Sequence, residues 1–132
     1  MPQPTDNSAL NQAQYIDQQR ARKALEYAHI GKRKSAAAYR TVVLKFPMMI
    51  KANGLAYALA FAYSKKKEKA YQLLYQQIEE WLRIEPQELL VFDTNREEFI
   101  DRLLHLTSQE LMWATHEVMK LLDWMKRFVE EA

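Results

Sequence analysis

Acidic residues paired with histidines are the side chains whose spacing comes closest to metal chemistry. Glu26 and His29 form an E-x-x-H pair, but a di-iron bundle needs that motif twice with two further carboxylates, and no second copy exists. Asp101 and His105, four residues apart, supply half a metal site at most, and a surface ion pair is the simpler interpretation. The dipeptide 116–117, His-Glu, lacks the second histidine of H-E-x-x-H. We therefore expect no metal and no cofactor.

The composition also argues against other kinds of catalytic site. The chain has no cysteine and two glycines, which removes thiolate sites and leaves no P-loop, dinucleotide fingerprint or serine elbow. We expect a protein that is not an enzyme and has no small-molecule substrate.

Basic side chains carry the strongest signal. Residues 20–69 hold thirteen basic and two acidic residues, a net charge of +11, whereas residues 70–132 hold six basic and thirteen acidic ones, a net charge of −7. This asymmetry favours a basic side for polyanions and an acidic side for other partners. The candidate nucleic-acid-binding residues are Lys32, Arg33, Lys34, Arg40, Lys45, Lys51, Lys65, Lys66, Lys67 and Lys69.

The basic residues lie in two runs, KRK at 32–34 and SKKKEK at 64–69. If the helices between them pack antiparallel, the runs meet at one end of the protein and form a phosphate footprint. Tyr39, Tyr57 and Tyr63 are candidates for stacking on unpaired bases. The alternative is a purely structural one, in which the lysines keep the helix ends solvated and the tyrosines fill the core.

Two tryptophans are candidates for a protein interface. Trp113 and Trp124 project within about twenty degrees of each other on a helix, at the edge of its apolar stripe. Tryptophan is enriched in interface hot spots, although tryptophans at a rim more often close a core.

The elements that must position these residues are helical. Ala, Leu, Glu, Lys, Arg and Gln dominate the composition, which predicts an all-α protein. A first helix is predicted over 8–30, with Gly31 after its end and an apolar face of Ala21, Ala24, Leu25 and Ala28, with Ile16, Arg20 and Tyr27 at its margin. A second helix from Ser35 is expected to stop at Phe46, because Pro47 disfavours helix in the residue before it.

A third helix is predicted over about 47–63, with Pro47 in its first turn. It is apolar on all sides, which is typical of a membrane span or of a buried central helix. Its charge-free run from Ala52 to Tyr63 has twelve residues, and a bilayer needs about twenty. We therefore expect a central helix inside a bundle, and no membrane span.

Three further helices complete the prediction. Ser64 is a candidate cap for a fourth helix ending near Ile84, with a stripe of Ala70, Tyr71, Leu74, Tyr75, Ile78, Trp81 and Leu82. Capping boxes at Thr94–Glu97 and Thr107–Glu110 predict the fifth and sixth helices. The fifth should bury Phe99, Ile100, Leu103 and Leu104, and the sixth Leu111, Ala114, Val118, Leu121, Leu122, Met125 and Phe128. The segment 87–92 stays undecided between a helical turn and an extended link.

These elements predict one compact all-α domain over residues 1–132, a bundle of five to six helices in which 1–10 is a candidate for disorder. No secretory signal is evident near Met1, so we expect a cytoplasmic protein.

The order of these elements resembles a known family. The stretch RARKALEY at 20–27, then AYRTVVLKFPMMIKANGLAYALAFAYSKKKEKAYQLLYQQIEEWL at 38–82, and finally LLDWMKRF at 121–128 are similar to the small α-helical subunit, the fifth Cmr protein, of type III-B CRISPR effectors. The similarity runs from Arg20 to Phe128.

The resemblance implies a non-catalytic protein. Copies would stack along a ribonucleoprotein filament beside the subunits that hold the guide RNA, and would help to accommodate target RNA in antiviral defence. The implied partners are other Cmr subunits, further copies of the chain, and guide and target RNA. The RNA contacts themselves are inferred from charge, with Lys45, Lys51 and the 65–69 cluster leading. The alternative is a helical protein–protein adaptor without nucleic-acid contact.

Overall fold

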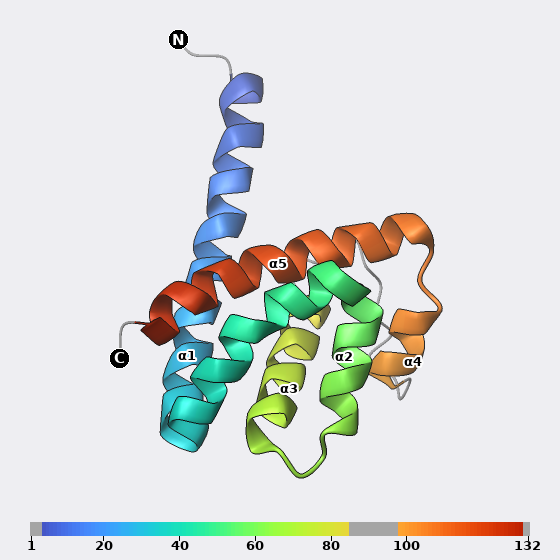
Figure 1. Ribbon diagram of the computed structural model, residues 1–132. Helices are drawn as coiled ribbons and strands as arrows, with labels where there is room; N and C mark the ends of the chain where they lie inside the picture. Colours follow the sequence, from blue (N-terminus) through green and yellow to red (C-terminus); the bar gives the residue numbers. More distant parts are fainter. Residues whose placement is uncertain (1–3, 85–97, 131–132) are drawn as a thin grey trace.

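A computed structural model describes residues 4–84 and 98–130, with side chains described from Asn11 onward. It contains α1 (Pro4–Asn53), α2 (Leu55–Ser64), α3 (Lys69–Arg83), α4 (Phe99–Leu104) and α5 (Ser108–Glu130). The described residues include no strand, which confirms the all-α class. The long α1 packs against α5, α3 and α2, and α2 also contacts α4 (Figure 1).

The predicted first and second helices are halves of α1, separated by a kink. Ala36 has non-helical backbone angles, φ 30° and ψ −110°, five residues beyond the predicted end at Gly31. Gly31 lies within the helix, and the position requires glycine because a Cβ there would overlap the ring of Tyr39. The kink lies one residue from the predicted start of the second helix at Ser35, but the predicted end of the first helix before Gly31 was wrong.

The predicted end at Phe46 is also wrong, because α1 continues through Pro47. Proline removes one backbone donor, so the carbonyl of Val43 loses its helical partner. Burial of Val43, Phe46 and Ile50 on both sides of the proline holds this part of the helix against the core.

The helix ends instead at Gly54, whose φ of 90° suits a residue without a Cβ. The continuous helix predicted over 47–63 is therefore divided between the end of α1 and α2. Nor is it buried on all sides: Leu55, Ala58, Leu59 and Ala62 face the core, while Met48 is 75% and Tyr57 57% exposed. The sequence is apolar on all sides of this segment because Met48 and Tyr57 are apolar residues that lie on its solvent side.

One hydrophobic core joins α1, α2, α3, α4 and α5. The largest fully buried side chains include Tyr39, Phe46, Leu55, Leu59, Leu74, Ile78, Trp81, Leu82, Leu103, Leu121, Leu122 and Met125. The predicted stripes of α3 and α5 are therefore largely confirmed, with Tyr71, Leu111 and Phe128 only partly buried.

Two predicted faces need correction. In α1 the buried face is rotated from the predicted one: Arg20 and Tyr27 are buried and Leu25 is 40% exposed. Arg20 and Tyr27 tolerate burial because their polar ends reach carboxylates of other helices. In α4, Phe99 and Leu103 are buried, but Leu104 is 63% exposed.

The capping predictions had different outcomes. In the Thr107 box, the Thr107 N–H donates to Glu110 Oε1 at 2.9 Å and the Glu110 N–H donates to Thr107 Oγ1 at 3.1 Å, as predicted. Ser64 is the last residue of α2 rather than a cap, and its hydroxyl donates to the Phe61 carbonyl. The Thr94–Glu97 box and the segment 87–92 lie outside the described residues. No described helix is long and apolar enough to cross a membrane.

Candidate nucleic-acid interface

Lysines from the two predicted basic runs meet in one groove. A hollow of about 430 Å³ is lined by Lys34 of α1, by Lys66 of the α2–α3 turn and by Lys69, Gln72, Leu73 and Gln76 of α3. We call it the lysine groove. Three ammonium groups around one hollow make a surface suited to phosphates.

The fold brings these lysines together by a route that differs from the predicted one. The second predicted helix and the start of the third form one continuous part of α1, so the chain does not reverse at Pro47. The chain reverses at Gly54, and α2 carries the 65–69 run back toward the bend of α1. Figure 1 shows that bend and the α2–α3 turn at the same lower end of the molecule.

Gln72 holds the turn that presents the lysines. Its side-chain amide Nε2 donates to the carbonyls of Ala62 and Lys65, each at 3.0 Å. These carbonyls belong to the end of α2, where the last groups of a helix lack helical partners. Gln72 therefore fixes the turn from within α3, and its amide is not free to read a base.

The lysines of the turn are not equivalent. Lys65 Nζ lies 4.9 Å from the ring centroid of Phe61 and 3.9 Å from a Glu68 oxygen. Lys66 Nζ lies 4.9 Å from the ring centroid of Tyr63. Lys67 and Lys69 are exposed and, like Lys34, have no carboxylate within ion-pairing distance among the described residues. Of the lysines around the turn and the groove, Lys34, Lys66, Lys67 and Lys69 therefore have no ion pair with a described carboxylate, whereas Lys65 has one.

The other predicted basic residues lie outside the lysine groove. Lys32 and Arg40 line a separate hollow of about 280 Å³ with Tyr39 and Val129. Lys45 and Lys51 are exposed on the second half of α1, and Arg33 is exposed beside Lys34. The ten predicted residues therefore do not all line one groove.

A comparison with protein families bears on what this basic surface serves. The model of the family described as CRISPR-associated protein (Cas_Cmr5) matches residues 16–132, which include the bend of α1 and the α2–α3 turn. The chain belongs to the Cas_Cmr5 family. This confirms the resemblance to the small subunit of the type III-B Cmr complex. The Cas_Cmr5 family is one of small, non-catalytic subunits that associate with other Cmr proteins.

Of the predicted stacking residues in this Cas_Cmr5 chain, Tyr39 is in the core. It is fully buried, its hydroxyl donates to Gln77 Oε1 at 2.6 Å, and burial raises its pKa well above the ordinary value. Tyr63 is partly buried against Tyr75. Tyr57 is 57% exposed, and of the three it is the most open to a base. The proposed stacking role of Tyr39 is therefore wrong.

The two candidate interface tryptophans differ in environment. Trp124 stacks on Phe128, and its indole N–H donates to Asp17 Oδ1 at 3.1 Å. Trp113 is 54% exposed. Trp113 is therefore open to solvent, while Trp124 serves the contact between α1 and α5.

The residues of the two acid–histidine pairs are exposed on the surface. Glu26 lies 3.6 Å from Lys23 Nζ, and His105 Nδ1 lies 3.8 Å from an Asp101 carboxylate oxygen. Within the described residues, no group of three or more potential ligands could hold a metal ion.

Sequence reasoning missed a buried polar cluster centred on Arg20. Arg20 is 5% exposed; its Nε donates to Glu117 at 2.7 Å and its Nη1 donates to Asp17 at 2.7 Å. Trp81 also donates to Glu117, at 2.9 Å. The recurrence of Arg20 at four-residue spacing with Ala24 and Ala28 was the available signal, because it placed a charge on the apolar face.

Proposed function

We propose that this chain is an RNA-facing small subunit of a type III-B CRISPR effector, in which copies stack along the guide and target RNA and help to accommodate the target in cytoplasmic antiviral defence. Membership of the Cas_Cmr5 family supports the assembly. The observation that carries the RNA contact is the lysine groove, where Lys34, Lys66 and Lys69 converge.

The chemistry of the lysine groove favours backbone contact over base reading. Ammonium groups attract phosphates regardless of sequence, and the side-chain nitrogen of Gln72, which lines the groove, is engaged by carbonyls. A subunit that must accept any target sequence needs contacts of this kind. We propose Tyr57, Lys45 and Lys51, exposed on α2 and the second half of α1, as further RNA contacts outside the groove.

A salt titration tests the RNA contact against the adaptor alternative. Binding of single-stranded RNA to the full chain should weaken steeply with salt, because phosphate contacts release counterions. The triple variant Lys34→Gln, Lys66→Gln, Lys69→Gln should lower the slope of log affinity against log salt by about 2, at about 0.7 per lost contact on a single strand.

The matched control is Arg22→Gln, Lys120→Gln, Lys126→Gln, which removes the same charge from exposed positions outside the lysine groove. It should retain most of the slope. Equal losses in both triples, or no binding by the unmodified chain at low salt, would favour the adaptor.

A further inference from the structure

The three lysines of the lysine groove belong to three different segments of the chain. Lys34 lies at the bend of α1, Lys66 in the α2–α3 turn, and Lys69 at the start of α3. Ammonium groups repel one another, so their convergence has to be held by other contacts in the fold. The groove therefore depends on what fixes the turn and the bend against α3.

The side chain of Gln72, on α3, fixes the turn. Its Nε2 donates to the carbonyls of Ala62 and Lys65, each at 3.0 Å, so one amide joins the end of α2 to the residue before Lys66. The turn has two backbone hydrogen bonds of its own, from the Lys65 N–H to the Ala62 carbonyl and from the Glu68 N–H to the Lys65 carbonyl. Gln72 adds the bonds that tie this turn to α3.

The side chain of Gln77, five residues further along α3 and 4% exposed, fixes the bend. Its Oε1 accepts the Tyr39 hydroxyl at 2.6 Å, and its Nε2 donates to the Tyr27 carbonyl at 3.2 Å. Tyr27 precedes the kink at Ala36, and Tyr39 follows it. One buried amide therefore spans the two arms of the bend and joins both of them to α3.

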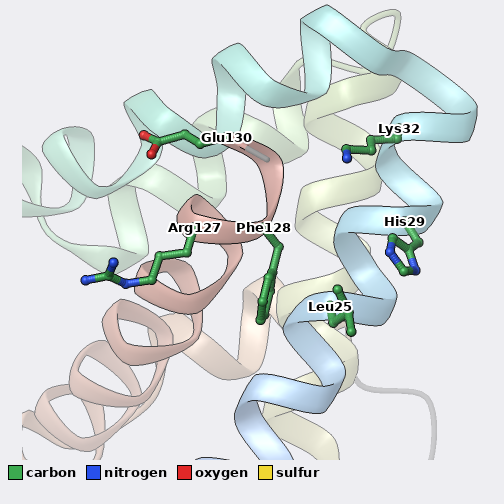
Figure 2. A pocket seen from close by; sticks show the side chains of 6 residues that line it. All are labelled: Leu25, His29, Lys32, Arg127, Phe128 and Glu130. Atoms are coloured by element: carbon green, nitrogen blue, oxygen red, sulfur yellow. The ribbon is translucent and has the colours of Figure 1, made fainter. Parts of the chain in front are cut away.

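The shape of the bend decides which lysine enters the groove. Lys32, only two residues before Lys34, lies instead beside a hollow of about 900 Å³ between α1 and the end of α5, which Leu25 and Phe128 also line. Figure 2 shows Lys32 at one end of that hollow. Another angle between the two arms would move Lys34 relative to the turn, so Gln77 positions Lys34 by fixing this angle.

We propose that Gln72 and Gln77 are positioning residues for RNA, which hold the turn and the bend so that the three lysines of the groove face one stretch of RNA backbone. The inference rests on the RNA contact in the proposed function and names the residues that prepare the site for it. Both amides are uncharged and are engaged within the protein. Their removal should therefore weaken RNA binding without a change in the charge of the surface.

The variants Gln72→Met and Gln77→Met test this, because methionine is flexible and unbranched and lacks the amide donor. Single-stranded RNA should bind each full chain about threefold to tenfold more weakly at every salt concentration, because the lysines then have to be ordered on binding. The slope of log affinity against log salt should stay the same, since the same ammonium groups still meet phosphates. A lower slope in these variants would contradict the proposal.

Gln76→Met is the matched control. Gln76 is an exposed glutamine that lines the same groove from the same helix, and its side chain has no hydrogen bond to another described residue. This variant should bind RNA nearly as well as the unmodified chain. Equal losses of affinity in Gln76→Met and Gln72→Met would show that Gln72 acts as a surface residue, and would overturn its positioning role.

Amide hydrogen exchange follows the position of the turn directly. In Gln72→Met, the N–H groups of Lys65 and Glu68 should exchange faster, whereas those of the buried Leu121 and Leu122 in α5 should not change. Weaker RNA binding without faster exchange at the turn would contradict the proposal.

A second variant tests the bend. Tyr39→Phe removes the hydroxyl that Gln77 accepts and should also weaken RNA binding. Because both variants break the same hydrogen bond, the double variant should bind no more weakly than Gln77→Met alone. Additive losses would show that Gln77 does not act through the bend.

The lysine triple variant separates this inference from the proposed function. If that variant lowers the salt slope while Gln72→Met and Gln77→Met bind RNA like the unmodified chain, the lysines act without positioning, and only this inference is wrong. If the unmodified chain binds no RNA at low salt, the RNA contact itself is wrong, and this inference falls with it.

Discussion

Arg20 shows how one buried charge can join three helices. It lies on α1, bonds to Glu117 of α5 and Asp17 of α1, and Glu117 also accepts from Trp81 of α3. The Glu117 carboxylate accepts hydrogen bonds from the Arg20 guanidinium and the Trp81 indole. A buried ion pair is tolerated when its charged groups are hydrogen-bonded in this way. The cluster thereby fixes how α1 sits against α5 and α3.

The Asp17 end of this cluster predicts a pH dependence. The hydrogen bond from the Trp124 indole, together with the Arg20 guanidinium, holds the pKa of Asp17 below its ordinary value. A lowered pKa in the folded state stabilises the protein above the unfolded pKa, and this stability is lost as pH falls through the folded pKa. Asp17→Asn should therefore be less stable than the unmodified chain at pH 7, and the gap should narrow as pH falls below about 4.

Urea unfolding at several pH values measures this gap. Asp123→Asn, at an exposed position of α5, serves as the control and should show no comparable narrowing. A gap for Asp17→Asn that stays constant down to about pH 2 would show that the carboxylate charge is not what stabilises the contact.

Gly31 is a second residue whose role depends on one contact. A helical Gly→Ala change ordinarily stabilises a protein by up to about 1 kcal/mol. Here the added Cβ overlaps the buried Tyr39 ring, so Gly31→Ala should instead lower the free energy of unfolding by about 1–3 kcal/mol. Thermal or urea unfolding measures it.

A double-mutant cycle isolates the cause of that loss. In a Tyr39→Ala background, Gly31→Ala should lose its penalty, because the ring that it meets is gone. A penalty of the same size in both backgrounds would place the strain elsewhere.

At the scale of elements, local signals were predictable and long-range ones were not. The Thr107–Glu110 box is confirmed because its two hydrogen bonds join residues three apart. The predicted end of the second helix at Phe46 was wrong because it depends on packing: burial of Phe46 and Ile50 holds α1 against the core on both sides of Pro47. The hydrophobic stripe of α3 was predictable from the sequence. The burial of Gln77 within it was not, because its hydrogen-bond partners Tyr39 and Tyr27 are distant in sequence.

The kink in α1 yields an element-scale prediction. Ala36 has a φ of 30°, which costs a residue with a Cβ about 1–3 kcal/mol. Ala36→Gly should relieve this strain and leave the free energy of unfolding equal or higher. Ala38→Gly, at an exposed helical position two residues on, should lower it by about 1 kcal/mol. Equal losses in chemical denaturation would show that residue 36 is helical in solution.

For the whole molecule, charge along the sequence predicted part of the candidate site. The meeting of the 32–34 and 65–69 runs was anticipated, and Lys34, Lys66 and Lys69 do line one groove. The separation of Lys32 and Arg40 into another hollow was not predictable, because it depends on where Val129 of α5 lies against the bend of α1. The hollow lined by Leu25 and Phe128 has no sequence signature for the same reason, because these residues come together only in the packed molecule.

The central claim is that RNA lies against the lysine groove in the assembled effector. A photo-reactive p-benzoylphenylalanine in place of Gln76, an exposed residue lining that groove, should cross-link to target RNA in the reconstituted complex. The same substitution at Gln109, exposed in the first turn of α5, is the matched control and should cross-link far less. Strong labelling at Gln76 and weak labelling at Gln109 is the predicted result. No RNA adduct at Gln76, or equal adducts at both positions, would contradict it.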